Sequence, residues 1–477
     1  MREHNTRRIG RGALCLLAAA AIAGCQKHEP SPLDRAAVEK ALTPPSPQVL
    51  RVQADALKHP ILPATKEDLS EGLSPDGAAV VAVLMNPSLR SARSKRSLAD
   101  AQILQAGILP DPEFSFGHDL PYSPRGQGLI GAFDLGLNWE MTQLISRPAR
   151  VKAAQAGRAA VDLDIAWQEW EVAQAAKLAV YKLRSQQERL ALSEELFQRL
   201  RENTALVRQA VEKRLMTEQD LAAAEAAENQ AEAALVAVKK DLRERHYALV
   251  QAMGLPADTP VTLRRGIVLP TKLTVPKASE LVKDMDQRRL DLVALRRGYD
   301  SQDQTLQAAI LGQFPKIGIG PRLGRDTGNV KTIGYSASVT LPIFDRNQGV
   351  IAQEKATRQQ LFDEYVNRVF EARSEIARLV ANVESINEQI RVSRAAQPAL
   401  VRLLETYRKA SERGQADLLS YYTAWNNVTS NRLETLSLQT DLVETQIALE
   451  LAAGLYRLEA LRTAPATPGA TMREVPK

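Results

Sequence analysis

Two long stretches that lack helix-breaking residues constrain the fold of this chain most strongly. Residues 149–253 contain no proline and a single glycine, Gly157, and residues 350–453 contain only Pro398 and Gly414. Proline and glycine destabilise a helix interior more than any other residues, so both stretches are predicted to form very long helices. A helix of roughly 65 residues reaches about 100 Å, which is too long for the inside of a compact domain.

The chain repeats one large unit. Three landmarks recur with a spacing of about 200 residues: Leu109-Pro110 as Phe314-Pro315, Ser146-Arg147 as Asp345-Arg346, and Ala252-Met253-Gly254-Leu255 as Ala452-Ala453-Gly454-Leu455. Solenoids and propellers repeat every 20 to 50 residues or so. The longer period therefore indicates an internal duplication of a large unit.

Composition favours long helices packed side by side and argues against a nucleic-acid partner. Only 5% of the residues are aromatic, which is low for a thick globular core. The formal charge of +6 comes from 62 Lys and Arg against 56 Asp and Glu. Removing the four arginines and one glutamate that precede Cys25 leaves 58 against 55, a net charge of +3. That charge is too small for the basic surface of a nucleic-acid-binding protein.

The N-terminus has the features of an export signal. Its arginines precede an apolar stretch, residues 13–22, that is shorter than the ~20 residues of a membrane-spanning helix. The following Ile22-Ala23-Gly24-Cys25 resembles a bacterial lipoprotein processing box, which implies that Cys25 is acylated. Gln26 replaces the aspartate that keeps resembling sequences in the inner membrane, so outer-membrane delivery is expected. An ordinary signal peptide with an incidental cysteine is the alternative.

The segment after Cys25 is predicted to be an extended, lipid-anchored tether. Residues 25–75 contain eight prolines, which disfavour regular helix. Cys15 leaves with the signal peptide, so no thiol pair remains for a disulfide or a thiolate metal site. A single lipid anchor holds a protein only moderately, and a second attachment to the membrane is therefore expected.

Two further segments alternate between apolar and small or polar residues. In a strand this period of two places all apolar side chains on one face. The alternation includes Phe114 and Phe116 in the first unit and Ile317 and Ile319 in the second. It continues in nine residues expected to face lipid: Phe133, Leu135, Leu137, Trp139, Met141, Ile333, Tyr335, Val339 and Leu341. The intervening residues 119–131 and 322–331 are predicted to be loops.

These strands fit a membrane barrel better than a soluble sandwich. A sandwich would cover the apolar face with a second sheet, and the chain offers only four strands. In a membrane barrel the apolar face contacts lipid, and about 9 to 11 residues are enough to cross the bilayer. Four strands cannot close a barrel, and open edges are not tolerated in hydrocarbon. Several chains are therefore expected to share one barrel.

Each long helical stretch is predicted to fold back as a hairpin. Apolar residues spaced three and four apart, as in a coiled-coil seam, are Ile376, Leu379, Val383, Ile386 and Ile390. Thr217 followed by Asp220 has the form of a capping box that opens a return helix. Gly414 occupies the equivalent turn in the second unit. A preceding helix, residues 76–106, is expected to break at Asn86-Pro87.

The predicted domain organisation follows from these features. It consists of a signal peptide (1–24), a tether (25–75), a first repeat of helix, strand pair and hairpin (76–253), a linker (254–277), a second such repeat (278–461) and a disordered tail (462–477).

The order of these elements resembles the TolC-like outer-membrane efflux proteins over roughly residues 75–461. Four runs carry the resemblance: Asn86-Pro87-Ser88-Leu89 with Ala92-Arg93, Leu109 to Glu113, Val339 to Asp345, and Gly414 to Leu419. The runs 109–116 and 147–154 resemble heavy-metal efflux members slightly more than drug-efflux members.

The resemblance implies a mainly α fold in which coiled-coil hairpins form a periplasmic tunnel. It also implies a homotrimer whose strands form one twelve-stranded transmembrane β-barrel. The trimer would dock on a periplasmic adaptor protein and an inner-membrane transporter, and the chain would be a passive conduit without a cofactor.

An acidic gate at the periplasmic tip is also implied by the resemblance. Asp417 matches the family position, and Asp220 is its internal counterpart. Ser420 occupies the next matching position, where relatives often carry a second acid. Capping of the helix N-terminus is the alternative role for both aspartates, because a carboxylate there accepts backbone hydrogen bonds and opposes the helix dipole.

The sequence contains no legible catalytic or metal-binding motif. The five histidines include no helical pair four residues apart and have no cysteine partners. The phosphate-loop pattern GxxxxGK[ST] is absent as well. The chain is thus expected not to be an enzyme. An efflux conduit for metal cations or small toxic compounds is the predicted function; the alternatives are the outer-membrane channel of a type I protein secretion system and a structural envelope spacer.

Overall fold

The computed structural model describes residues 28–44, 49, 52, 72–122, 128–413 and 418–456. The signal peptide, Cys25, Asp417 and the tail 462–477 lie outside the described residues. The chain divides into two compact units, residues 1–44 and 45–477.

The first unit contains a short helix, α2 (Arg35–Leu42), whose N-cap Asp34 accepts a hydrogen bond from the Ala37 N–H at 2.5 Å. Here the prediction of an entirely extended tether was wrong. Residues 33–43 form a proline-free run between the clustered prolines, and a capping aspartate at its start suffices to begin a helix.

From residue 72 onward the second unit contains two consecutive helices, α4 (Pro75–Met85) and α5 (Pro87–Gly107). Ser74 and Asn86 cap them through their side chains, and each is followed by a proline at the first helical position. Proline fits there because its missing N–H would have no helical partner. The predicted break at Asn86-Pro87 is confirmed.

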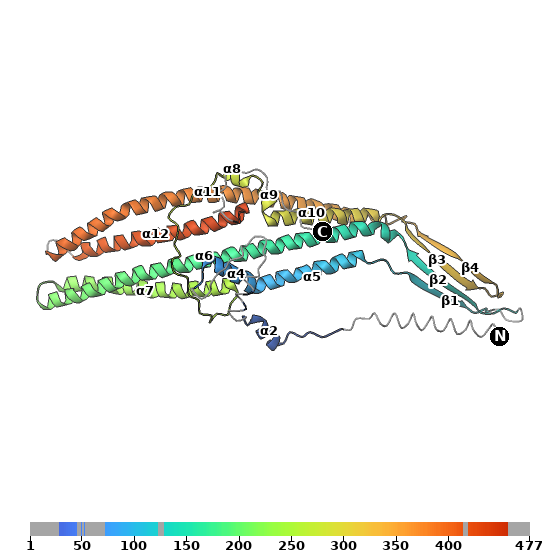
Figure 1. Ribbon diagram of the computed structural model, residues 1–477, viewed down its shortest axis with the longest axis horizontal. Helices are drawn as coiled ribbons and strands as arrows, with labels where there is room; N and C mark the ends of the chain where they lie inside the picture. Colours follow the sequence, from blue (N-terminus) through green and yellow to red (C-terminus); the bar gives the residue numbers. More distant parts are fainter. Residues whose placement is uncertain are drawn as a thin grey trace. The chain divides into compact units, whose positions relative to one another are not determined.

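Four antiparallel strands form a single sheet in the order β1-β2-β3-β4. They are β1 (Glu113–Asp119), β2 (Ala132–Glu140), β3 (Lys316–Arg325) and β4 (Lys331–Thr340). The sheet extends from the ends of α5, α6, α10 and α11 (Figure 1). Both predicted strand pairs are present, and β2 of the first repeat pairs with β3 of the second.

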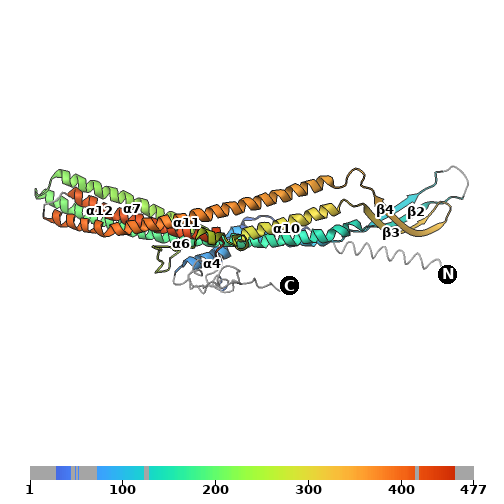
Figure 2. The same cartoon turned by 90° about the horizontal axis from the view of Figure 1, so that it is seen from above.

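Two helical hairpins are the largest elements of the second unit. They are α6 (Thr142–Glu212) with α7 (Glu218–Met253), and α11 (Gln348–Glu412) with α12 (Leu418–Ala453). The partners of each hairpin lie side by side in both views (Figures 1 and 2). α6 begins seven residues before the predicted Ala149 and therefore contains Pro148. Pro148 is the seventh residue of this 71-residue helix and removes one backbone hydrogen bond from its second turn, yet the helix continues through it.

Between the repeats the chain forms no helix over residues 254–277, and its only described pairing is the bridge between Leu73 and Leu263. Three helices follow: α8 (Ala278–Val282), α9 (Met285–Arg288) and α10 (Leu290–Leu311). α10 packs against both α6 and α11, so α6 of the first repeat contacts α10 of the second.

The two repeats dock their helix ends in the same way. Asn86 donates a side-chain hydrogen bond to the Ala252 carbonyl at the end of α7 (3.2 Å), and Arg289 donates to the Ala452 carbonyl at the end of α12 (3.1 Å). Each helix ends in a left-handed glycine, Gly254 at φ 71° and Gly454 at φ 63°. The equivalent contacts confirm the internal duplication.

Candidate functional site: a one-sided sheet and two helical turns

The strand register gathers the apolar side chains on one face of the sheet. Leu135 is paired with Phe116 on one side and with Leu323 on the other, and Leu323 is paired with Ile333. By the same register this face also carries Phe114, Phe133, Leu137, Trp139, Ile317, Ile319, Pro321, Tyr335, Ala337 and Val339. Met141 and Leu341 directly follow β2 and β4.

This apolar face is open to its surroundings. Ile333 is 87% exposed and Tyr335 is 91% exposed, and in the described part of the chain the sheet has no second layer. Contiguous apolar surfaces of this size mark a site of contact with lipid or protein. All nine residues predicted to face lipid belong to this face or directly continue it.

The structure extends the predicted strands. β3 reaches Arg325 and β4 begins at Lys331, so the prediction that residues 322–331 form a loop was wrong for half of that range. Proline argues against a strand because it lacks an N–H. Pro321, however, lies at a gap in the β2–β3 pairing, where no ladder bond is lost. The alternation of Gly320, Arg322 and Gly324 with Pro321 and Leu323 was the missed signal.

The opposite face is small and polar. Asp134 of β2 and Arg322 of β3 form an ion pair on it. A Cβ atom on Gly320 would coincide with the Leu137 carbonyl, so only glycine allows β2 to approach β3 this closely. A channel wall needs such a face, because polar groups toward water and apolar groups toward lipid satisfy both environments.

Aromatic residues mark the two ends of β2. Arg325 lies over the Phe133 ring, 5.2 Å from its centroid, and donates from Nη2 to the Gly131 carbonyl at 2.9 Å. At the other end Trp139 donates from Nε1 to the Pro110 carbonyl at 2.7 Å. A tryptophan with a satisfied ring N–H, such as Trp139, is typical of the borders of a membrane.

The turn of the first hairpin contains the predicted capping box. The Asp220 carboxylate accepts hydrogen bonds from the Thr217 N–H (2.9 Å) and hydroxyl (2.7 Å), and the Asp220 N–H donates to the Thr217 hydroxyl oxygen (3.2 Å). The two Thr217 donors hold the pKa of Asp220 below its ordinary value. In this structure Asp220 acts as a helix cap.

The second turn lies outside the described residues together with Asp417, but the start of α12 is described and contains Ser420. Beyond it Tyr422 packs into the core of the first hairpin with Leu200, Val207 and Ala224. Its hydroxyl accepts a hydrogen bond from Asn203 of α6. Burial raises the pKa of Tyr422 to about 12. The two hairpins are therefore joined near their turns.

Among the described residues, no group of three or more His, Cys, Asp or Glu side chains is arranged to hold a metal ion. A search of the same residues finds no helix with the length and apolar character needed to cross a membrane.

Comparisons find a similar fold in several outer-membrane proteins. Residues 281–455 match a family model described as outer membrane efflux protein, whereas no individual curated protein matches the sequence. A membrane protein from Pseudomonas aeruginosa has a similar fold, with a TM-score of 0.68 and 20% identity over 83% of this chain and 98% of that chain. VceC, an outer membrane protein of Vibrio cholerae, is similar with a TM-score of 0.65 and 19% identity over 80% and 96% of the two chains. The CmeC outer membrane channel of Campylobacter jejuni is similar with a TM-score of 0.67 and 17% identity over 84% and 91%.

Proposed function

We propose that this chain is a TolC-like outer-membrane efflux protein and forms the outer-membrane channel of a tripartite efflux system. In this function three copies form a passive conduit that extends into the periplasm. A periplasmic adaptor protein and an inner-membrane pump deliver the cargo to it. The chain itself performs no chemical reaction and is not an enzyme.

One observation supports this function above all others: a one-sided sheet with two open edges. β1 and β4 are the outer strands of the sheet and have no further strand partner among the described residues. Hydrocarbon does not tolerate unpaired backbone groups, so each edge needs a strand from another copy. Pairing β4 of one copy with β1 of the next, around a threefold axis, closes a barrel of twelve strands.

The polar face of the sheet supports cations as cargo. It carries four carboxylates, on Glu113, Asp119, Asp134 and Glu140, against the two cations Lys316 and Arg322. A water-filled lumen with a net negative wall concentrates cations and repels anions. We therefore infer metal cations or small cationic toxic compounds as the cargo, in agreement with the resemblance of residues 109–116 to heavy-metal efflux members.

Two further parts of the proposal concern the lipid anchor at Cys25 and the gate at the periplasmic end. Acylation of Cys25 would fix the N-terminus to the outer membrane. Asp417 would form an acidic ring at the periplasmic end of the conduit, one carboxylate from each copy. Ser420 supplies no second charge there, so this gate would have a single ring, and the described capping bonds give Asp220 a structural role.

The experiment that tests the function is the survival of cells that lack this chain. Growth is measured on a panel of metal salts, dyes and antibiotics, with wild-type protein and Cys25→Ser restored in parallel. Sensitivity to metal salts alone supports cation efflux, and sensitivity to organic compounds assigns the channel to multidrug export. Unchanged growth together with loss of an exported protein would instead identify a type I secretion channel.

A further inference from the structure

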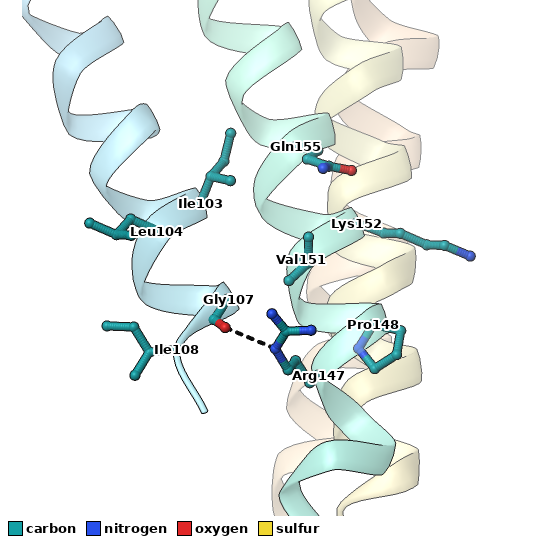
Figure 3. A pocket seen from close by; sticks show the side chains of 9 residues that line it. All are labelled: Ile103, Leu104, Gly107, Ile108, Arg147, Pro148, Val151, Lys152 and Gln155. Atoms are coloured by element: carbon teal, nitrogen blue, oxygen red, sulfur yellow. Dashed lines mark hydrogen bonds between the residues drawn. The ribbon is translucent and has the colours of Figure 1, made fainter. Parts of the chain in front are cut away.

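A groove lies between α5 and α6 close to the ends from which the sheet extends (Figure 3). Ile103 and Leu104 of α5, Ile108 just after it and Val151 of α6 give the groove an apolar lining. Leu104 is 71% exposed, so the lining is not covered by the described part of the chain.

Arg147 is the charged residue inside this groove. It donates from Nε to the Gly107 carbonyl at 2.8 Å (Figure 3). Among the described residues its two Nη atoms make no hydrogen bond and no ion pair. A guanidinium held by one bond in this way presents its remaining donors in a fixed direction, which suits a phosphate group.

The cations nearest the sheet differ from those farther along α6. Residues 142–161 contain no acidic residue, and within the described chain Arg147, Arg150 and Lys152 form no ion pair. Lys152 lies on the rim of the groove, with its ammonium group extended away from the apolar lining (Figure 3). This part of α6 therefore has an unbalanced positive charge.

About three to four helical turns farther from the sheet than Arg147, Arg158 and Arg96 between α5 and α6 are both paired. Arg158 lies 2.9 Å from Asp100, and Arg96 lies 2.7 Å from Asp162. The contrast separates two environments on the same pair of helices. The cations farther from the sheet pair with carboxylates of the protein itself. The cations beside the sheet have no such partner in the described chain and can bind an external anion.

The groove also lies close to the sheet along the chain. Ile108 is joined to Glu113, the first residue of β1, by a short connection, and Arg147 follows Glu140, the last residue of β2, by about two helical turns. If the sheet spans the bilayer, the groove lies at the level of the headgroups on the periplasmic side. Basic pockets at this level bind anionic lipid headgroups.

We propose that this groove binds one anionic phospholipid per chain. An acyl chain lies against Ile103, Leu104 and Val151, and the phosphate lies beside Arg147. This inference rests on the proposed membrane location of the sheet. A phospholipid matches both the apolar lining and the positive charge of the groove. The acyl chains on Cys25 carry no anion and would leave Arg147 unpaired.

The test uses the intact trimer, purified in a mild detergent and titrated with phosphatidylglycerol or with phosphatidylcholine of the same acyl chains. Native mass spectrometry counts the lipids bound to each trimer. Arg147→Gln removes the charge, Arg147→Lys restores it, and Val151→Trp fills the groove. Lys355→Gln, which removes an exposed cation of α11 away from the groove, is the matched control.

We expect up to one phosphatidylglycerol per chain, bound about tenfold more tightly than phosphatidylcholine, because a charge-assisted hydrogen bond contributes roughly that factor. Arg147→Gln abolishes the preference, Arg147→Lys retains most of it, and Val151→Trp weakens the binding of both lipids. Lys355→Gln leaves both affinities unchanged.

Equal affinity for the two lipids in the wild type, or an undiminished preference in Arg147→Gln, overturns the inference. So does a Val151→Trp protein that binds lipid normally but loses its trimer, since the groove would then be covered by a neighbouring copy. The mass of the assembly reports separately on the proposed function. Monomers alone contradict the trimeric conduit, whereas trimers without a lipid preference contradict only the lipid site.

Discussion

Gln174 of α6 donates a hydrogen bond from Nε2 to the Glu450 carboxylate of α12 at 2.7 Å, and this contact joins the two repeats across 276 positions of sequence. Gln446 donates to the other Glu450 oxygen at 3.1 Å. Burial raises the pKa of Glu450, although the hydrogen bonds from Gln446 and Gln174 and the nearby Lys177 act in the opposite direction. The other amide atom, Gln174 Oε1, is buried and has no hydrogen-bond partner. The two repeats therefore meet at a carboxylate in an environment that disfavours its charge.

The first prediction concerns the stability of this junction against pH. A carboxyl group whose pKa is higher in the folded state binds its proton more tightly there, so stability rises as the pH falls through that raised pKa. Glu450→Gln removes this contribution, and its new amide can donate to Gln174 Oε1. We expect the variant to match or exceed the wild-type melting temperature at pH 7.5 and to lose the part of the rise toward pH 5 that comes from Glu450.

The control for this prediction is Glu450→Ala, which leaves the Gln174 amide without partners. It should destabilise the protein by about 1 to 3 kcal/mol at both pH values, as expected for an unsatisfied buried polar group. A Glu450→Gln variant with the full pH dependence of the wild type would assign that dependence to other groups.

The second prediction concerns the apolar face of the sheet. Leu135→Arg and Val339→Arg should each prevent assembly in the outer membrane, because an arginine facing lipid near the bilayer midplane costs about 2 to 4 kcal/mol. Ser338→Arg, which places the same residue on the polar face of β4, is the matched control and should assemble. Membrane fractionation and the fraction of heat-resistant trimer measure the outcome. Normal assembly of both apolar-face variants would rule out contact of this face with lipid.

The third prediction separates backbone strain from steric overlap at a helix end. Gly254 has φ +71°, and a Cβ atom there would lie 2.6 Å from the Asn86 Cα, whereas Gly266 has φ +85° with open space around it. Gly266→Ala should cost about 1 kcal/mol from backbone strain alone. Gly254→Ala adds overlap with α5 and should cost a further 1 to 3 kcal/mol. Denaturant unfolding measures both, and equal losses would show that the α7–α5 contact yields easily.

The fourth prediction assigns Asp220 to capping. Asp220→Asn and Thr217→Ala should each destabilise α7 by about 1 kcal/mol and leave the conductance of the channel unchanged. Because the pKa of Asp220 is lowered, the stabilisation is present above its ordinary value and is lost as the pH falls through the lowered one. Conductance in planar bilayers and thermal unfolding measure the two properties. A large change in conductance from Asp220→Asn would instead place this carboxylate at a gate.

The long helices and the strand alternation could be predicted because both are local patterns. The absence of proline over residues 149–253 and the period of two in β2 each determine one element with little help from the rest of the chain. The early start of α6 and the length of β3 were missed because Pro148 and Pro321 normally interrupt these elements. The surroundings of these two prolines in the fold allow the helix and the strand to continue, and such surroundings cannot be predicted from a local sequence pattern.

The contacts between the repeats were not predictable for the same reason. Glu450 and Gln174, or Tyr422 and Asn203, are ordinary residues on polar helix faces in the sequence. They gain significance only when the duplicated units are placed side by side. Likewise the groove at Arg147 depends on which cations find a carboxylate, which requires the packing of α5 against α6.

The free edges of β1 and β4 also make an isolated copy of this chain prone to aggregation. Each edge can pair with any available strand, and the apolar face of the sheet adds surface for non-native association. In the proposed trimer three molecules must meet to close the ring, so correct assembly becomes faster with local concentration, as does misassembly. Biogenesis of the proposed channel is thus a competition between closure and aggregation, and it favours delivery of the chains to one place on the membrane before their sheets are exposed.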